Sequence, residues 1–130
     1  MVPNEFAAEF AEKIRKICRI QGRTFTQEEI RDWWEALGPL GSDALAVIDN
    51  LLTERTEFLA IAGVVKEVRR LRAARVARAT TPMTPPDLDI SDAATYLRWI
   101  NEWTRLTSDG ATPEDAEAGA AAAARATPPR

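Results

Sequence analysis

The side chains that most often perform catalysis are scarce in this 130-residue sequence, which holds no histidine and one cysteine, Cys18. A Ser-His or Cys-His nucleophile therefore cannot form, and neither can an ordinary zinc site. Cys18 lies beside Ile14 and Ile17 on the apolar face of an expected helix, where a thiol usually serves as a small core side chain. We expect no enzymatic activity, no bound metal ion and no cofactor.

Two pairs of adjacent acidic residues offer another route to catalysis, general acid and base chemistry. Glu28-Glu29 and Glu114-Asp115 each fall in the first turn of an expected helix. Carboxylates at this position stabilise the helix dipole, so we assign both pairs to helix initiation. The sequence also holds no GxGxxG, GxxxxGK[ST], CxxC or HExxH motif, the patterns typical of phosphate, redox and zinc sites.

An amphipathic segment at residues 26–37 contains two of the four tryptophans. Thr26 is a suitable N-cap, Glu29 completes a capping box with it, and Gly38-Pro39 ends the predicted helix. Adjacent tryptophans point about 100° apart on a helix, so we expect one of them to be partly exposed although both are mainly core. Apolar side chains recur at i, i+3, i+4 and i+7, namely Ile30, Trp33, Trp34 and Leu37.

Three further helices are expected in the first part of the chain, at residues 4–19, 43–55 and 60–78. Asn4 and Ser42 are the candidate N-caps of the first two. Together with the tryptophan segment they predict a small four-helix domain at residues 1–78. Its expected core consists of Phe10, Ile14, Ile17, Ile30, Trp33, Trp34, Leu37, Ile48, Leu51, Leu52, Val65, Val68 and Leu71.

Positive charge is concentrated in the last of these helices. Residues 66–78 hold six basic side chains and one acidic side chain, whereas the whole chain carries a net charge of -3. Arginines replace apolar residues on the core face after Leu71, so we expect the helix to leave the core there and project. The basic side chains are interpreted either as a solvated helix end or as a surface for an acidic partner or for phosphates. They are Lys66, Arg69, Arg70, Arg72, Arg75 and Arg78.

The rest of the chain is predicted to be a proline-rich linker at residues 79–90, a C-terminal helical segment at 91–126 and a tail at 127–130. Ser91 is the candidate cap of an aromatic helix, and Thr112-Pro113 begins an alanine-rich helix that has little to bury and is expected to fray. Such a segment is too small for its own core, so its apolar face should dock on the first domain or on a partner. That face consists of Tyr96, Leu97, Trp99, Ile100, Trp103 and Leu106.

Residues from about 10 to 78 resemble the N-terminal domain of the phage replicative-helicase loader/inhibitor family, in its short actinobacteriophage version. That family carries an F-[ST]-x-E-x-[IV]-x-x-W-x-x-x-L segment, which is matched here at residues 25–37. Ala44-Leu45 with Ile48, then Phe58-Leu59, then the arginine-rich helix follow in the family's order. A proline usually opens that last helix, whereas Ala60 stands here.

The resemblance implies a non-enzymatic adaptor in DNA replication that binds a hexameric DnaB-type helicase and loads or inhibits it. It also implies that the C-terminal region engages the helicase, so the aromatic face between Tyr96 and Leu106 is the expected helicase contact. Single-stranded DNA and an origin-binding protein are further candidate partners, and no membrane partner is expected. A DNA-binding regulator of helix-turn-helix type and a small phage structural or host-takeover protein are the alternatives. The absence of a long apolar run and the acidic residues near Met1 predict an intracellular protein. The resemblance implies that this compartment is the cytosol of a bacterial host.

Overall fold

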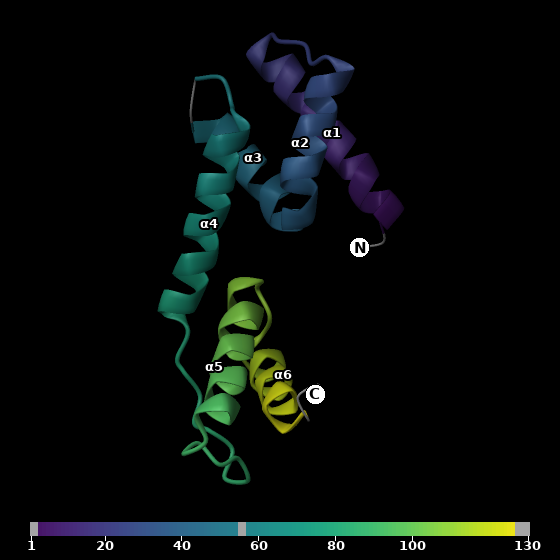
Figure 1. The fold of residues 1–130 in the computed structure, drawn as a ribbon. Coiled ribbons are helices and arrows are strands. Elements are labelled where there is room, and N and C mark those ends of the chain that lie inside the picture. Colours follow the sequence, from purple (N-terminus) through teal and green to yellow (C-terminus); the bar gives the residue numbers. More distant parts are fainter. Residues whose placement is uncertain (1–2, 55–56, 127–130) are drawn as a thin grey trace. The chain divides into compact units, whose positions relative to one another are not determined.

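The computed structural model describes residues 3–54 and 57–126, and over these residues the protein is all-α, as predicted (Figure 1). Its helices are α1 (Pro3–Gln21), α2 (Gln27–Leu37), α3 (Ser42–Glu54), α4 (Ile61–Arg78), α5 (Ala93–Ser108) and α6 (Pro113–Arg125). The contacts divide the chain into unit 1 (Met1–Arg70) and unit 2 (Leu71–Arg130). This division lies inside α4, whereas the predicted boundary followed residue 78.

Helix initiation follows the capping residues with three exceptions. One is Ser42, because α3 begins at Ser42 itself, so this residue lies inside the helix and is not its N-cap. Thr26 Oγ1 accepts from the Glu29 amide at 3.1 Å and Glu29 Oε1 accepts from the Thr26 amide at 3.2 Å, which forms the predicted capping box. Thr112 caps α6 as predicted, with Pro113 in the first turn. The cap of α5 is Asp92 rather than Ser91, because the Asp92 carboxylate accepts from the Ala94 amide.

The third exception is α1, which begins at Pro3, so Asn4 lies inside its first turn and is not the N-cap. Proline suits the start of a helix because the amide hydrogen it lacks has no intrahelical partner there. The predicted end of the third helix at Arg55 and the predicted tail at residues 127–130 lie outside the described residues.

The end of α2 occurs at the predicted place for a different reason. Gly38 has a right-handed φ of -52° and begins a short 3-10 turn (Gly38–Leu40). The left-handed position is Gly41, with a φ of 66°, and there the chain turns into α3. Left-handed angles are readily accepted only by glycine, so Gly41 takes the role predicted for Gly38.

The core of unit 1 contains most of the residues expected there. The exceptions on α2 are Ile30 and Trp34, which are each 40% exposed, while Val65 and Leu71 on α4 are half-buried. Placing Ile30 in the core was therefore wrong, since Trp33 and Leu37 supply the buried side of α2. The expectation that one of the two adjacent tryptophans is partly exposed is confirmed at Trp34. The expected core residues that are buried are Phe10, Ile14, Ile17, Trp33, Leu37, Ile48, Leu51, Leu52 and Val68.

A three-residue ionic cluster joins α1 to α3. Lys13 Nζ and Lys16 Nζ lie 2.7 and 2.9 Å from the two carboxylate oxygens of Asp49. Partial burial alone raises the pKa of Asp49, but the hydrogen bonds and charges of the two lysines outweigh burial and lower the pKa below its usual 3.8. The carboxylate is thus more stable in the folded protein than in the unfolded chain.

The end of α1 is tied to the segment before α4. Gln21 donates to the Glu57 carbonyl at 2.9 Å and accepts from the Leu59 amide at 3.1 Å. Arg23 donates to the Leu59 carbonyl at 2.8 Å, and its guanidinium lies over the rings of Phe25 and Phe58. These contacts satisfy backbone groups of a non-helical segment, which would otherwise need water.

Unit 2 has a core of its own, formed where α5 and α6 pack side by side (Figure 1). Trp99 and Trp103 are 3% and 4% exposed and pack against the buried alanines of α6. The expectation that α6 frays was wrong. Its alanine side chains form a flat surface on which the indole rings of α5 can lie, so the helix does bury apolar area. The buried alanines are Ala116, Ala120, Ala121 and Ala124.

The proline-rich segment is attached to this core. Leu88 packs against the tryptophan cluster, and Arg125 forms a two-pronged ion pair with Asp87 at 2.7 and 2.8 Å. The predicted linker at residues 79–90 therefore contacts α5 and α6 through these two side chains.

Replacing Asp49 with Asn should lower the free energy of unfolding by about 1 kcal/mol near pH 7, because the carboxylate is partly exposed and solvent screens the pair. The pKa of Asp49 is lowered on folding, so its contribution is complete above the usual pKa of 3.8 and disappears as pH falls below it. Urea unfolding of both proteins at neutral and acidic pH measures this. Glu54→Gln, an exposed neutralisation on the same helix, is the control and should change stability by less than about 0.5 kcal/mol.

Replacing Gly110 with Ala should destabilise unit 2 by about 1–2 kcal/mol, because an L side chain is strained in the left-handed region. Gly110 has a φ of 94°, and a Cβ atom there would lie 3.3 Å from Arg75 Cζ. In the matched Gly63→Ala change the new Cβ meets nothing within 4 Å, so helix propensity should stabilise α4 by up to about 1 kcal/mol. Thermal unfolding that shows Gly110→Ala as stable as the original would contradict the prediction.

Candidate functional site

An apolar groove between α1 and α2 is the candidate interaction site of unit 1. Its volume is about 310 Å³, a size at the lower end of the range for ligand pockets. Arg15 is the one charged residue among those that line it. The lining residues are Ala7, Phe10, Ala11, Ile14, Arg15, Ile30 and Trp34.

Helical spacing explains why these side chains meet. On α1 the lining residues recur at i, i+3, i+4 and i+7, beginning at Ala7, and on α2 Ile30 and Trp34 are four residues apart. Phe10 and Ile14 are buried and form the floor, while the alanines of α1 leave room above them.

An aromatic cluster holds the α2 side of the groove in place. The Trp34 ring lies 5.7 Å from the Phe6 ring and 5.1 Å from the Phe10 ring between centroids, the second pair in an edge-to-face arrangement. A Cβ atom added at Gly38 would lie 3.6 Å from the Trp34 ring, so only a small residue leaves space there. The indole is thus packed along one side while 40% of the residue remains exposed.

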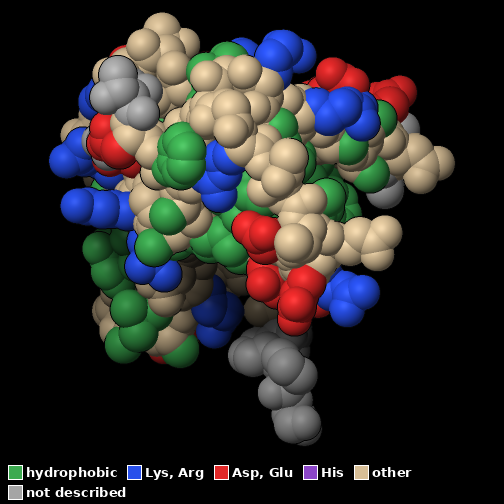
Figure 2. All heavy atoms as spheres, turned by 90° about the horizontal axis from the view of Figure 1, so that it is seen from above, with side chains coloured by type: hydrophobic (Ala, Val, Ile, Leu, Met, Phe, Trp, Pro, Cys, Tyr) green, Lys and Arg blue, Asp and Glu red, His purple; other side chains and the backbone are tan. Residues whose placement is uncertain are grey.

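The exposed part of this groove is an unused source of binding free energy. Covering the exposed 40% of Trp34 would contribute about 2 kcal/mol at the usual value per unit of apolar area. Hydrophobic side chains are also exposed among basic and acidic ones on the face shown in Figure 2. An exposed tryptophan beside an apolar groove is the arrangement typical of a protein-binding hot spot.

The acidic side chains of α2 do not border the groove. Glu28, Asp32 and Glu35 are exposed along this helix, but Asp32 lies two residues from both Ile30 and Trp34 and so is on the opposite face. On α1, Arg15 forms an ion pair with Glu12, which offsets its positive charge. A partner segment with an apolar face is therefore complementary to this site.

The partner surface predicted at the C-terminal helix is mostly not available. Trp99 and Trp103 are buried in unit 2, and Ile100 and Leu106 are partly buried and pack against them. Tyr96 and Leu97 remain 42% and 52% exposed. The prediction that the aromatic stripe docks elsewhere was wrong for the two tryptophans, because α6 covers them.

The six predicted basic residues differ in their surroundings. Arg75 donates to the Ser108 carbonyl at 3.0 Å and is half-buried, so it is not part of a projecting rod. Arg72 is also half-buried, and Arg70 lies 3.5 Å from Glu67. The exposed members of the set are Lys66, Arg69, Arg70 and Arg78.

The hydrophobic pattern of the sequence did not indicate two of the residues that line the groove. Ala7 and Ala11 carry little hydrophobic signal individually, yet they follow the period of Phe10 and Ile14 along the same helix. A search for small residues flanking an apolar stripe, combined with an exposed tryptophan, could have indicated a groove.

Within the described residues, no cluster of three or more acidic or cysteine side chains is placed to hold a metal ion. Over the same residues, no helix combines the length and the apolar character needed to cross a membrane. No protein-family model, curated protein or solved structure matches this chain.

Proposed function

We propose that this protein is a non-enzymatic adaptor in DNA replication, which binds a hexameric DnaB-type helicase and loads or inhibits it. The observation that carries the proposal is the apolar α1/α2 groove with the half-packed Trp34 at its edge. An adaptor needs a binding surface rather than a catalytic centre, and this groove is such a surface. The helicase is proposed as the partner because of the resemblance of residues 10–78 to the loader/inhibitor family.

The structure gives the residues of that resemblance two different roles. Trp33 and Leu37 are buried, and Thr26 forms the capping box, so these positions maintain the fold. Ile30 and Trp34 face the groove and are exposed. In this proposal the exposed pair contacts the helicase, while unit 1 acts as the binding domain.

The groove favours an amphipathic helix as the element that is bound. An α-helix that lies between two others buries side chains at i, i+3, i+4 and i+7 in their groove. The helicase segment would place apolar residues over Phe10 and Ile14. Residues 79–90 then serve as the connection to a C-terminal segment that has its own core and is not needed for this contact.

Replacing Ala7 with Glu should weaken helicase binding by at least about tenfold, because the change introduces a carboxylate into an apolar groove. Ala8→Glu is the matched control: it adds the same charge one residue later on α1, at an exposed position outside the groove lining, and should change affinity by less than about twofold. Calorimetry with the host's DnaB-type helicase measures both, and circular dichroism verifies that both variants fold.

Two outcomes separate the parts of this proposal. If the original protein neither binds the helicase nor alters its ATPase or unwinding rate, the helicase is not the partner. If the helicase binds the original protein and Ala7→Glu equally well, the α1/α2 groove is not the contact surface.

A further inference from the structure

The two ends of the α1/α2 groove differ in chemistry. Five residues, 22–26, connect α1 to α2, so the two helices run in opposite directions as a helical hairpin. Ile30 therefore lies at the same end of the groove as Ile14 and Arg15. Trp34 lies at the opposite end, where its ring is 5.7 Å from that of Phe6 between centroids. The groove thus has an aromatic end at Trp34 and a second end at Ile30.

Three exposed arginines gather at the second end, which we call the basic end. Arg15 lines the groove there, and Arg19 follows it by one turn on the same side of α1. On α2, Arg31 is adjacent to Ile30 and three residues before Trp34, which places it at the outer edge of the groove. Both helices therefore contribute positive charge to the same end.

Acidic side chains near these arginines leave a net positive charge. Glu12 pairs with Arg15, but the two side chains are 67% and 63% exposed, so solvent screens the pair and a partner carboxylate can replace Glu12. On α2, Glu28 and Glu35 flank Arg31 along the helix, on the side that faces away from the groove. The basic end therefore presents three arginines and one glutamate to a partner, whereas the lining at the aromatic end is uncharged.

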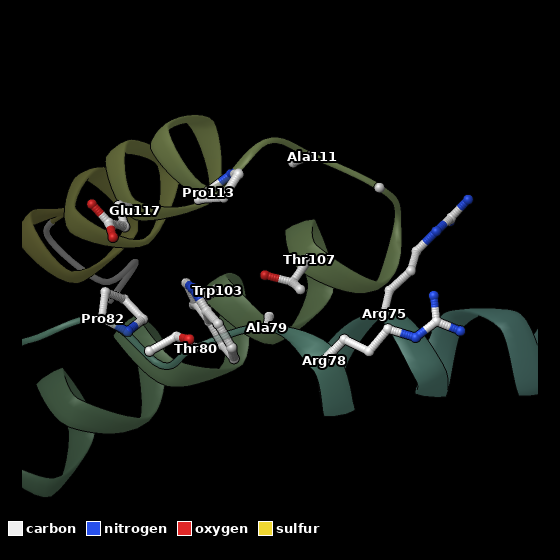
Figure 3. A pocket seen from close by; sticks show the side chains of 11 residues that line it. Arg75, Arg78, Ala79, Thr80, Pro82, Trp103, Thr107, Ala111, Pro113 and Glu117 are labelled. Atoms are coloured by element: carbon white, nitrogen blue, oxygen red, sulfur yellow. The ribbon is translucent and has the colours of Figure 1, made fainter.

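The larger cavity of the protein, which lies in unit 2, differs from this groove. Its volume is about 650 Å³, and Arg75 and Arg78 lie on one side of Trp103 with Glu117 on the other (Figure 3). Trp103 is 4% exposed, and Arg75 already donates to a backbone carbonyl at the end of α5. That cavity therefore offers a ligand little aromatic surface, whereas the groove exposes part of both α2 side chains that line it.

We propose that the partner segment of the α1/α2 groove is an amphipathic helix with acidic side chains at one end of its apolar stripe. The stripe packs over the buried floor of the groove, and the acidic end lies among Arg15, Arg19 and Arg31. The lining of α1 runs from Ala7 to Arg15, a rise of about 12 Å, which matches about two turns of a bound helix. This inference rests on the proposed function, since it takes the groove as the contact surface, and it adds the charge and the direction of the bound helix.

Calorimetric titration of the full-length protein with two synthetic peptides tests the charge of the bound helix. Both peptides are amphipathic helices of about 16 residues with the same leucine stripe, and the first turn of one carries glutamates where the other carries lysines. The acidic peptide should bind at least about fivefold more tightly than the basic peptide. With Arg19→Glu/Arg31→Glu the order should reverse, a result that different helix propensities of the peptides cannot produce.

The same double variant tests the inference on the helicase. Arg19→Glu/Arg31→Glu should weaken helicase binding by at least about fivefold at low salt, and the difference should shrink in about 0.5 M NaCl because salt screens charges at the rim. Arg69→Glu/Arg70→Glu makes the same change in net charge at exposed positions of α4 outside the groove lining, and it should alter affinity by less than about twofold. Circular dichroism verifies that both variants fold.

The outcomes separate this inference from the proposed function. Equal affinity of the original protein for the two peptides, or an order that the double variant leaves unchanged, would overturn the inference. If the helicase binds the original protein and the double variant equally well while Ala7→Glu weakens binding, the groove contact stands and the charge preference is wrong. If the helicase does not bind but the acidic peptide is preferred and the order reverses, the charge preference stands and the helicase is not the partner.

Discussion

The packing of two tryptophans on an alanine surface is the contact on which unit 2 depends. Trp99 and Trp103 are large and flat, and the buried face of α6 consists of small side chains that allow the helices to approach. At Gly119 an added Cβ would lie only 2.3 Å from Leu106 Cδ1, so glycine helps to seat the Leu106 side chain. This contact buries the apolar surface of both helices and supplies the base against which Leu88 and the wall of the larger cavity are positioned.

Unit 1 uses its tryptophans differently. Trp33 is buried, whereas Trp34 is packed on one side by Phe6 and Phe10 and left open on the other. Helix α1 is already held by the lysine pair on Asp49 and by the Gln21 contacts, so a closed aromatic core at α2 is not its only support. The groove can therefore remain open, because other contacts hold α1 in place. This arrangement provides the surface that the proposed adaptor function requires.

The arginines of α4 illustrate how position on one helix decides the role of a charge. Arg69 is exposed, Arg70 pairs with Glu67, and Arg75 secures the end of α5 through the Ser108 carbonyl. A count of basic residues treats these side chains as equal, although an arginine that is half-buried and donates to a backbone carbonyl has lost much of its conformational freedom. Only side chains such as Arg78, which are exposed and line a cavity, are well placed to recognise a ligand.

The sequence by itself determined the helical class, most helix boundaries and the caps at Thr26 and Thr112, because hydrophobic period and capping are local properties. It also indicated most of the buried residues of unit 1. Only the tertiary structure decided which apolar faces are covered. The sequence pattern predicted an exposed stripe that includes Trp99 and Trp103, but α6 covers both. The pattern placed Trp34 mainly in the core, but 40% of this residue is exposed. Periodicity identifies an apolar face of a helix, but the segment that covers this face can be distant in the sequence. When that segment is rich in alanine, its hydrophobicity is too low to be recognised from the sequence pattern.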